Sequence, residues 1–160
     1  MHITPLSATR RTCSAEDVDT IKLSRDLTAL GYTAQELGRM ARSGELHRIR
    51  RGAYADEPAP TDAGDNHRQL IETTVRLSSP SCVVSHLSAA VLHELPLWDD
   101  LLGRVHLTRD RVTGAKLRRY SQLHVGALAA DEITEVDGIR VTTVARTAVD
   151  VARTSPSYGR

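Results

Sequence analysis

Seven histidines are the side chains of this 160-residue sequence best suited to bind a metal or to transfer a proton. His86 and His93 lie on one predicted helix, about 10.5 Å apart by helical rise, which is too far to share one ion. His106 and His124 lie on separate predicted strands, and neither has an acidic neighbour in the sequence. Locally bonded or exposed histidines are therefore predicted, with no metal site and no cofactor.

Carboxylates are the next candidates for chemistry, because metal-dependent nucleases need a cluster of them, usually with a lysine close by. The only lysines are Lys22 and Lys116, and neither follows an acidic residue by two positions. An acidic run leads into a predicted hairpin and is expected to be a solvated edge: Asp131, Glu132, Glu135 and Asp137. A glycine-rich phosphate loop and a nucleophile elbow are both absent from the sequence. No catalytic residue is predicted, and the chain is not expected to be an enzyme.

Positive charge is concentrated in two stretches, although the whole chain carries only +1. Between Arg39 and Arg51 there are five arginines and one glutamate, a local charge of +4. Between Arg104 and Arg119 there are six basic residues and one aspartate, a local charge of +5. Such patches suit the phosphates of duplex DNA. With no Phe, one Trp and four Tyr, a platform that stacks unpaired bases is disfavoured.

The first basic stretch falls on elements whose order is typical of a winged helix. Ser24 is expected to cap a short helix that Gly31 ends, and Thr33 with Glu36 predicts a capping box for a second helix. A basic strand over 46–51, a turn at Gly52 and a return strand over 53–55 complete a hairpin. The predicted DNA-binding residues on the second helix and hairpin are Thr33, Gln35, Arg39, Arg42, Ser43, Arg48, Arg50 and Arg51. Additional DNA contacts are predicted in the second basic stretch, at Arg109, Arg111, Lys116, Arg118 and Arg119.

The fold class predicted for the whole chain is α+β, in two domains. Residues 1–57 form a winged helix-turn-helix with its core at 20–55, and an acidic, proline-containing break follows. Residues 58–160 form a small α+β domain with a mostly antiparallel sheet, in which Asn66 caps a helix and Asp137-Gly138 makes a hairpin turn. No apolar run approaches the ~20 residues of a membrane span. Two distant cysteines, expected to be free thiols, and the lack of a secretory signal predict a cytoplasmic protein.

Several motifs together resemble one known family. The segment 44–54, GELHRIRRGAY, follows the pattern G-x-L-x-R-x-x-R-G-x-Y. Three further segments fit in order: SHLSAA at 85–90, VHLT at 105–108 and GIRVTTVARTAVD at 138–150. The sequence resembles the AbiEi-type antitoxins, winged-helix regulators of type IV toxin–antitoxin systems that are abundant in actinobacteria, over roughly residues 20–153.

This resemblance implies a regulator that binds double-stranded operator DNA and represses its own toxin–antitoxin operon. The implied functional partner is a nucleotidyltransferase-like toxin, which such antitoxins counteract without needing to bind it directly. Family proteins usually continue beyond the last motif, so a truncated chain is one expectation. Two alternatives stay open: the N-terminal part of a nuclease-like defence protein whose catalytic region is missing, and a protein-interaction module with a winged-helix shell.

Overall fold

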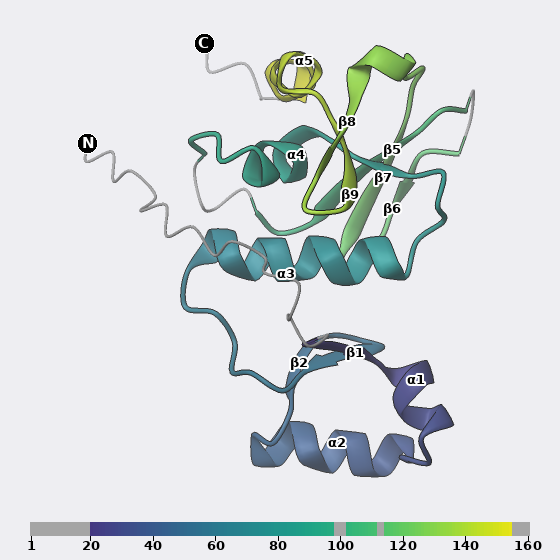
Figure 1. The fold of residues 1–160 in the computed structure, drawn as a ribbon, viewed down its shortest axis with the longest axis vertical. Helices are drawn as coiled ribbons and strands as arrows, with labels where there is room; N and C mark the ends of the chain where they lie inside the picture. The colour runs from purple at the N-terminus through teal and green to yellow at the C-terminus, as the bar shows by residue number, and fades with distance from the viewer. Residues whose placement is uncertain (1–19, 98–101, 112–113, 155–160) are drawn as a thin grey trace.

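The computed structural model describes residues 20–97, 102–111 and 114–154, which form two units in succession (Figure 1). The first unit contains β1 (Ile21–Leu23), α1 (Ser24–Ala29), α2 (Ala34–Ser43), β2 (His47–Arg50) and β3 (Ala53–Ala55). The second contains α3 (Ala63–Arg76), β4 (Val83–Val84), α4 (His86–Leu92), β5 (Val105–Arg109), β6 (Lys116–Leu117), β7 (Ser121–Val125), the 3-10 helix η2 (Ala130–Glu132), β8 (Ile133–Val136), β9 (Ile139–Thr142) and α5 (Val144–Thr154). The predicted α+β class is confirmed. The predictions for residues 1–19 lie outside the described residues.

The first unit is built around β3, which pairs antiparallel with β1 on one side and β2 on the other. All three residues of β3 are buried, because neighbouring strands cover both edges and because Ala53 and Tyr54 pack into two hydrophobic clusters. Two helices pack beside this sheet, and the core between them contains Leu27, Leu37, Leu46 and Tyr54. The predicted hairpin is confirmed. The predicted Ser24 cap is wrong, since the N-cap of α1 is Leu23 and no side chain caps that helix end.

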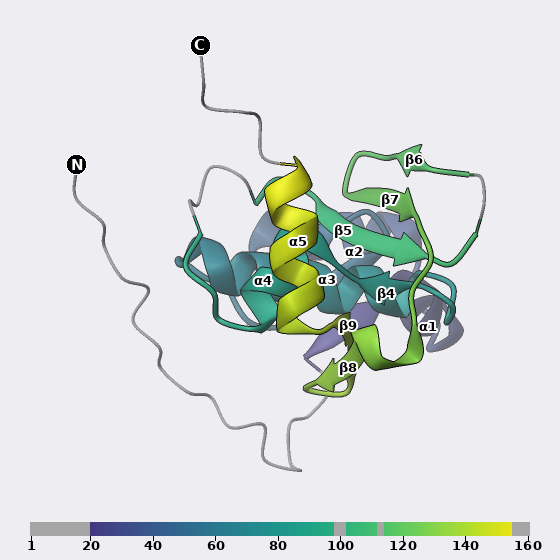
Figure 2. The same ribbon diagram turned by 90° about the horizontal axis from the view of Figure 1, so that it is seen from above.

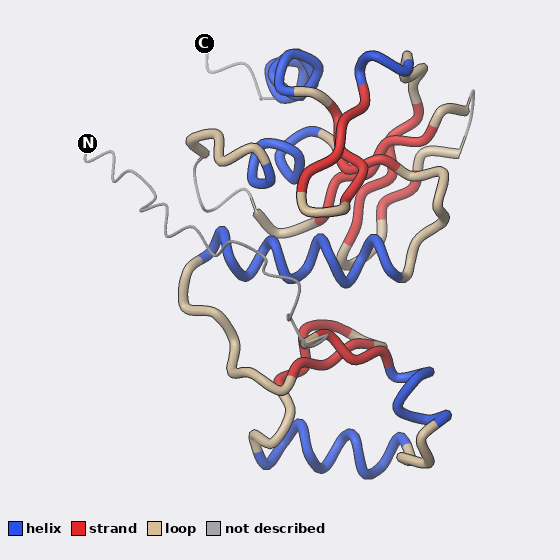
Figure 3. The backbone as a smooth tube through the Cα atoms, in the orientation of Figure 1, coloured by secondary structure: helices blue, strands red, loops and turns tan. Residues whose placement is uncertain are grey.

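Residues 56–62 connect the units without a helix or strand, and α3 then lies between the two sheets (Figure 3). Asp62 caps α3 by accepting a hydrogen bond from the backbone N–H of Asp65 at 3.0 Å. The cap predicted at Asn66 is therefore misplaced by one helical turn. The Asn66 amide instead donates to the carbonyl oxygens of Pro60 and Asp62, which ties the connection to the helix.

The second unit has a six-stranded sheet in the order β6-β7-β5-β4-β9-β8. β5 pairs with β7 and β4 with β9 in parallel, while the other neighbouring pairs are antiparallel. The predicted mostly antiparallel sheet holds for three of the five pairs of neighbouring strands, and the two parallel pairs were not predicted. The chain does not return from β5 by a simple hairpin: β6 forms an edge strand antiparallel to β7, so β7 runs in the direction of β5.

The core of the second unit lies where α4 meets this sheet. α4 contacts α3, α5 and β5, and Figure 2 shows α5 running past α4. Ile71, Val84, Leu107 and Val141 are fully or almost fully buried in this core. The predicted Asp-Gly hairpin is confirmed between β8 and β9. Asp137 and Gly138 have φ angles of 50° and 72°, and the type I′ turn requires positive φ at both central residues.

Candidate nucleic-acid interface

α2 begins at a complete capping box, as the sequence predicts. The backbone N–H of Glu36 donates to Thr33 Oγ1 at 3.2 Å, and the N–H and hydroxyl of Thr33 both donate to Glu36 Oε2 at 2.8 Å. The hydrogen bond from the Thr33 backbone, with that from its hydroxyl, lowers the pKa of Glu36 and keeps this carboxylate ionised. The Thr33 side chain thus holds the helix end, and its predicted role as a DNA contact is not favoured by this geometry.

The two faces of α2 have different surroundings. Leu37 is 2% exposed in the core of the first unit, and Met40 and Ala41 pack against that core. The opposite face carries three exposed side chains, Gln35, Arg39 and Arg42. These three, with Thr33 and Glu36, line a hollow of about 330 Å³. The helix therefore presents one amide and two guanidinium groups to solvent.

The C-terminal end of α2 is fixed by a second local arrangement. Gly44 adopts a left-handed conformation with φ 84°, which ends the helix and which other residues adopt at a cost. The Ser43 hydroxyl lies 2.7 Å from Glu45 Oε1 and 3.1 Å from the Met40 carbonyl oxygen. Like Thr33, Ser43 is exposed but already bonded within the chain, so it is a weaker candidate for a DNA contact than the sequence predicted.

The three arginines of the hairpin that were predicted to contact DNA lie in different surroundings. Arg48 and Arg51 are exposed. Arg50 points instead to the second unit, where its Nη1 donates to Thr74 Oγ1 at 2.7 Å and its guanidinium lies 5.0 Å from the ring centre of Tyr120. Burial lowers the pKa of Arg50, which nevertheless stays protonated. The prediction of a phosphate contact at Arg50 is not supported by this placement, because the side chain joins the two units.

Sequence reasoning missed the partners of Arg50 because they lie 24 and 70 residues further along the chain. The only local indication of where Arg50 points is the alternation of side chains along the strand. Ile49 packs against the small cluster of Ile21, Leu23 and Ala53, so its neighbour Arg50 must lie on the other face of the hairpin. The position of α3 determines what this face of the hairpin contacts.

The basic residues of the second stretch, between Arg104 and Arg119, also lie in different surroundings. Arg109 ends β5 and its Nη2 donates to Cys82 Sγ at 3.4 Å, so it is held within the second unit. The other four predicted contacts are exposed: Arg111, Lys116, Arg118 and Arg119. Arg119 lies 5.2 Å from the ring centre of Tyr120, on which Arg50 also packs. This end of the stretch therefore lies next to the hairpin of the first unit.

The histidine prediction is wrong for His106 and His124, which are bonded to each other, whereas His86 has a local partner in Ser85. His86, His106 and His124 lie together in the second unit, although the sequence placed them on separate elements with local or solvent partners. The sequence reasoning compared His86 with His93, whose Nε2 is bonded to the Thr142 carbonyl oxygen at 2.7 Å. The parallel pairing of β5 with β7, which the sequence did not predict, is what brings the cluster together.

The exposed face of α2 and the basic hairpin beside it lie within the segment that is similar to a known protein family. Residues 23–55 match the family model described as a transcriptional regulator, AbiEi antitoxin. The match begins at the last residue of β1 and ends at the last residue of β3. It confirms the predicted resemblance over this segment. No curated protein matches the chain.

Among the described residues, no helix combines the length and apolar character needed to cross a membrane.

Proposed function

We propose that this chain is a DNA-binding transcriptional regulator of the antitoxin type, in which residues 20–55 act as a winged helix-turn-helix. α2 is the recognition helix, and the hairpin of β2 and β3 is the wing. The observation that carries this proposal is the division of α2: one face is fixed in a core, while Gln35, Arg39 and Arg42 extend into solvent around one hollow. The match to the regulator family over the same residues supports it.

The side chains on α2 have the chemistry to distinguish base pairs. An α-helix about 10–12 Å across fits the major groove, which is about 12 Å wide. Arg39 or Arg42 can pair with the two acceptors of a guanine, and Gln35 with the donor and acceptor of an adenine. The wing residues Arg48 and Arg51 neutralise phosphates beside that groove. Arg111, Lys116, Arg118 and Arg119 would extend the same contact from the second unit.

The resemblance and the family model support the biological role that we propose. The protein represses its own toxin–antitoxin operon in the cytoplasm, and its functional partner is a nucleotidyltransferase-like toxin that it need not touch. Its role requires no catalytic residue. A nucleotidyltransferase gene next to that of this protein would support the assignment to a toxin–antitoxin system.

The Arg39→Ala substitution tests the proposed recognition helix. Binding to a duplex from the protein's own promoter should weaken about 10- to 100-fold, because one bidentate base contact discriminates by roughly 1–3 kcal/mol. Binding to a scrambled duplex at the same salt concentration should change far less. Arg153→Ala removes an equal charge from an exposed position on α5 and is the matched control.

Three results would contradict parts of the proposal. Equal losses on both duplexes would make Arg39 a phosphate contact, and no loss on either would exclude α2 as the recognition helix. If the wild-type protein bound no duplex in a salt-dependent manner, the winged helix would be an interaction module for another protein.

We also propose that the units are separate domains divided at about residues 57 and 58. Residues 56–58 are exposed, and the whole connection from 56 to 62 is without regular structure. Limited proteolysis should therefore cut first within 56–62 and leave two resistant fragments. Early cleavage elsewhere, with this segment protected, would argue against the division.

A further inference from the structure

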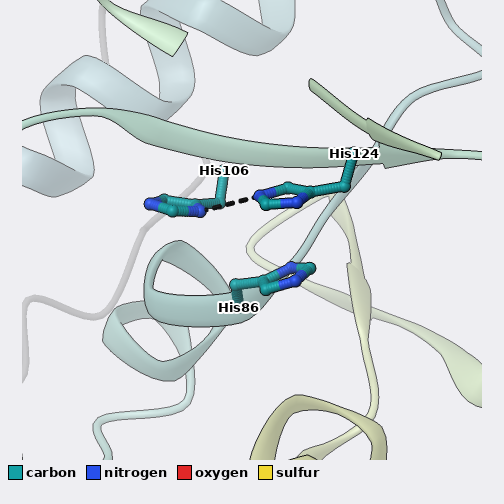
Figure 4. A group of neighbouring side chains, drawn as sticks. All are labelled: His86, His106 and His124. Atoms are coloured by element: carbon teal, nitrogen blue, oxygen red, sulfur yellow. Dashed lines mark hydrogen bonds between the residues drawn. The ribbon is translucent and has the colours of Figure 1, made fainter. Parts of the chain in front are cut away.

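Three histidine side chains from separate elements meet in the second unit. His86 begins α4, His106 lies on β5 and His124 lies on β7 (Figure 4). One ring nitrogen of each lies within 4.8 Å of the others, and within the part of the chain that the structure describes no second group of this kind occurs. The cluster lies in the second unit, away from α2 and the wing.

The register of β5 and β7 brings two of these histidines together. In the parallel pair of β5 and β7, His106 is opposite Gln122 and Thr108 is opposite His124. Side chains two positions apart on a strand share a face, so His106 and His124 project from the same side of the sheet. α4 covers that side, and the hydroxyl of its Ser88 accepts a hydrogen bond from the His106 backbone N–H at 2.9 Å.

His86 reaches the other two rings through an unusual backbone conformation. Its φ angle is 52°, in the left-handed region that residues with a side chain seldom occupy. Such a conformation costs on the order of 1–3 kcal/mol and persists only when the surrounding structure enforces it. Here it places the His86 ring parallel to that of His124, with 3.8 Å between the ring centres.

A metal ion binds the uncharged form of imidazole, through a ring nitrogen that carries no proton. His106 Nδ1 and His124 Nε2 are 2.9 Å apart, so one of them donates its proton and the other accepts it. Burial lowers the pKa of His86 and of His106 to about 4, and burial also lowers the pKa of His124. All three rings are therefore uncharged at neutral pH, the form in which imidazole is a ligand.

A second layer of polar groups holds His86. Its Nδ1 is 2.9 Å from Ser85 Oγ, which itself accepts a hydrogen bond from Thr108 Oγ1 at 2.7 Å. The Asp150 carboxylate lies 3.9 Å from the same nitrogen and is held at 3.0 Å by Arg146. In metal sites, the nitrogen that does not bind the ion commonly faces a carboxylate or another acceptor in this way. This arrangement leaves Nε2 as the ligand atom of His86.

One side of the cluster opens into a cavity of about 800 Å³. His86 and His124 line it together with charged side chains from η2 and α5: Asp131, Glu132, Arg146, Asp150 and Arg153. Arg146 is paired with Glu132 at 2.8 Å and with Asp150. Through this cavity, water or a small anion can reach the rings of His86 and His124.

We propose that His86, His106 and His124 bind one divalent transition-metal ion of the zinc class, with a fourth coordination position open to this cavity. Imidazole suits zinc, copper and nickel, and three histidines with an open position form a known type of zinc site. This inference does not depend on DNA binding by the first unit.

The three rings must move before all of them can bind one ion, because they are stacked. Tetrahedral coordination with Zn–N bonds of about 2.0–2.1 Å places ligand nitrogens about 3.3 Å apart. Because the lone pair of each nitrogen lies in its ring plane, stacked rings cannot all point at one ion. Binding therefore breaks the hydrogen bond between His106 and His124 and turns His86 out of its stack on His124. The ring that donates in that bond transfers its proton through water to its other nitrogen, so each ring stays a neutral ligand.

The test uses the full chain without a histidine tag and Zn²⁺ as the probe. Equilibrium dialysis should show one Zn²⁺ bound per chain, and Co²⁺ in its place should give the visible absorption of a tetrahedral site. His106→Asn and His124→Gln keep a polar atom near each lost nitrogen, and each should weaken Zn²⁺ binding by more than about 100-fold, beyond the 10- to 100-fold typical of losing an outer partner. His47→Ala, in the wing, is the matched control and should bind as the wild type does.

A measurement on the wild-type protein guards against variants that fail to fold. Histidine side-chain NMR should show the nitrogen shifts of His86, His106 and His124 changing on addition of one equivalent of Zn²⁺. The shifts of His47, His67 and His93 should stay the same. No uptake of Zn²⁺ by the wild type, or uptake that the double variant H106N/H124Q retains, would overturn the proposal.

Discussion

The side chains of α2 that we propose to bind DNA are exposed to water, whereas the three clustered histidines of the second unit are buried or half-buried. Gln35, Arg39 and Arg42 are exposed, and one helix sets their spacing. His86, His106 and His124 are buried or half-buried, and three elements from different parts of the chain position them. A charged group on a surface keeps its hydration until a partner arrives, while a group placed in a core must be neutral or paired.

This difference predicts different sensitivities for the two units. Surface arginines that bind phosphates respond to salt, because binding releases the counterions of DNA. Enclosed imidazoles respond to acid, since protonation places a charge where water cannot solvate it. The experiments below separate these two responses, and they run from the largest expected effect to the smallest.

The largest effect is expected from Leu37→Ala. Leu37 packs with Leu27, Leu46 and Tyr54, and truncating a buried leucine typically lowers the free energy of unfolding by about 2–5 kcal/mol. Urea denaturation should show this loss. Leu30→Ala, at a position 76% exposed, should change stability by less than about 0.5 kcal/mol. Equal stability of the two variants would mean that α2 does not pack on its Leu37 face.

Acid should weaken the second unit through His67. This ring is 2% exposed; its Nδ1 donates to the Leu102 carbonyl oxygen at 3.0 Å, and its Nε2 is 2.9 Å from Ser88 Oγ. Burial lowers the pKa of His67 from 6.5 to about 4. Between these values the unfolded chain binds more protons than the folded one, so stability is full above about pH 6.5 and falls as the pH drops toward 4.

The His67 contribution amounts to about 3 kcal/mol across that window. Denaturation at a series of pH values should show the fall for the wild type. His67→Ala should be less stable at pH 7 and should lose part of the pH dependence, whereas His47→Ala should keep all of it. A variant with an unchanged pH profile would show that His67 is not the group responsible.

The contrast between the units also explains how far the sequence could predict the molecule. The capping box, the hairpin at Gly52 and the Asp-Gly turn depend on neighbours within a few residues, and each is confirmed. Two local predictions also failed, the helix caps at Ser24 and Asn66, but the failures that affect the sites involve distant partners. Arg50 meets Thr74 and Tyr120 only because α3 lies between the sheets. The histidines meet only through the parallel register of β5 and β7, which no local pattern encodes.

The smallest effect distinguishes two adjacent arginines of the wing. Arg51 is exposed at the tip of the hairpin, whereas Arg50 is bonded to Thr74 and packs on Tyr120. If Arg51 contacts one phosphate, Arg51→Ala should lower the slope of log K against log salt by about 0.9 and weaken binding to all duplexes alike. Arg50→Ala should leave that slope unchanged, because its guanidinium is already bonded within the chain.

Arg50→Ala should act instead on the contact between the units. Removing the guanidinium leaves the Thr74 hydroxyl without this partner and opens the face of Tyr120, so proteolysis within 56–62 should become faster while Arg51→Ala leaves its rate unaltered. DNA titrations of both variants at several salt concentrations, together with the digestion rates, distinguish a phosphate contact from a contact between the units. If Arg50→Ala lowered the salt slope as much as Arg51→Ala, its side chain would have to leave Tyr120 on binding DNA, and the two units would have to move apart in the complex.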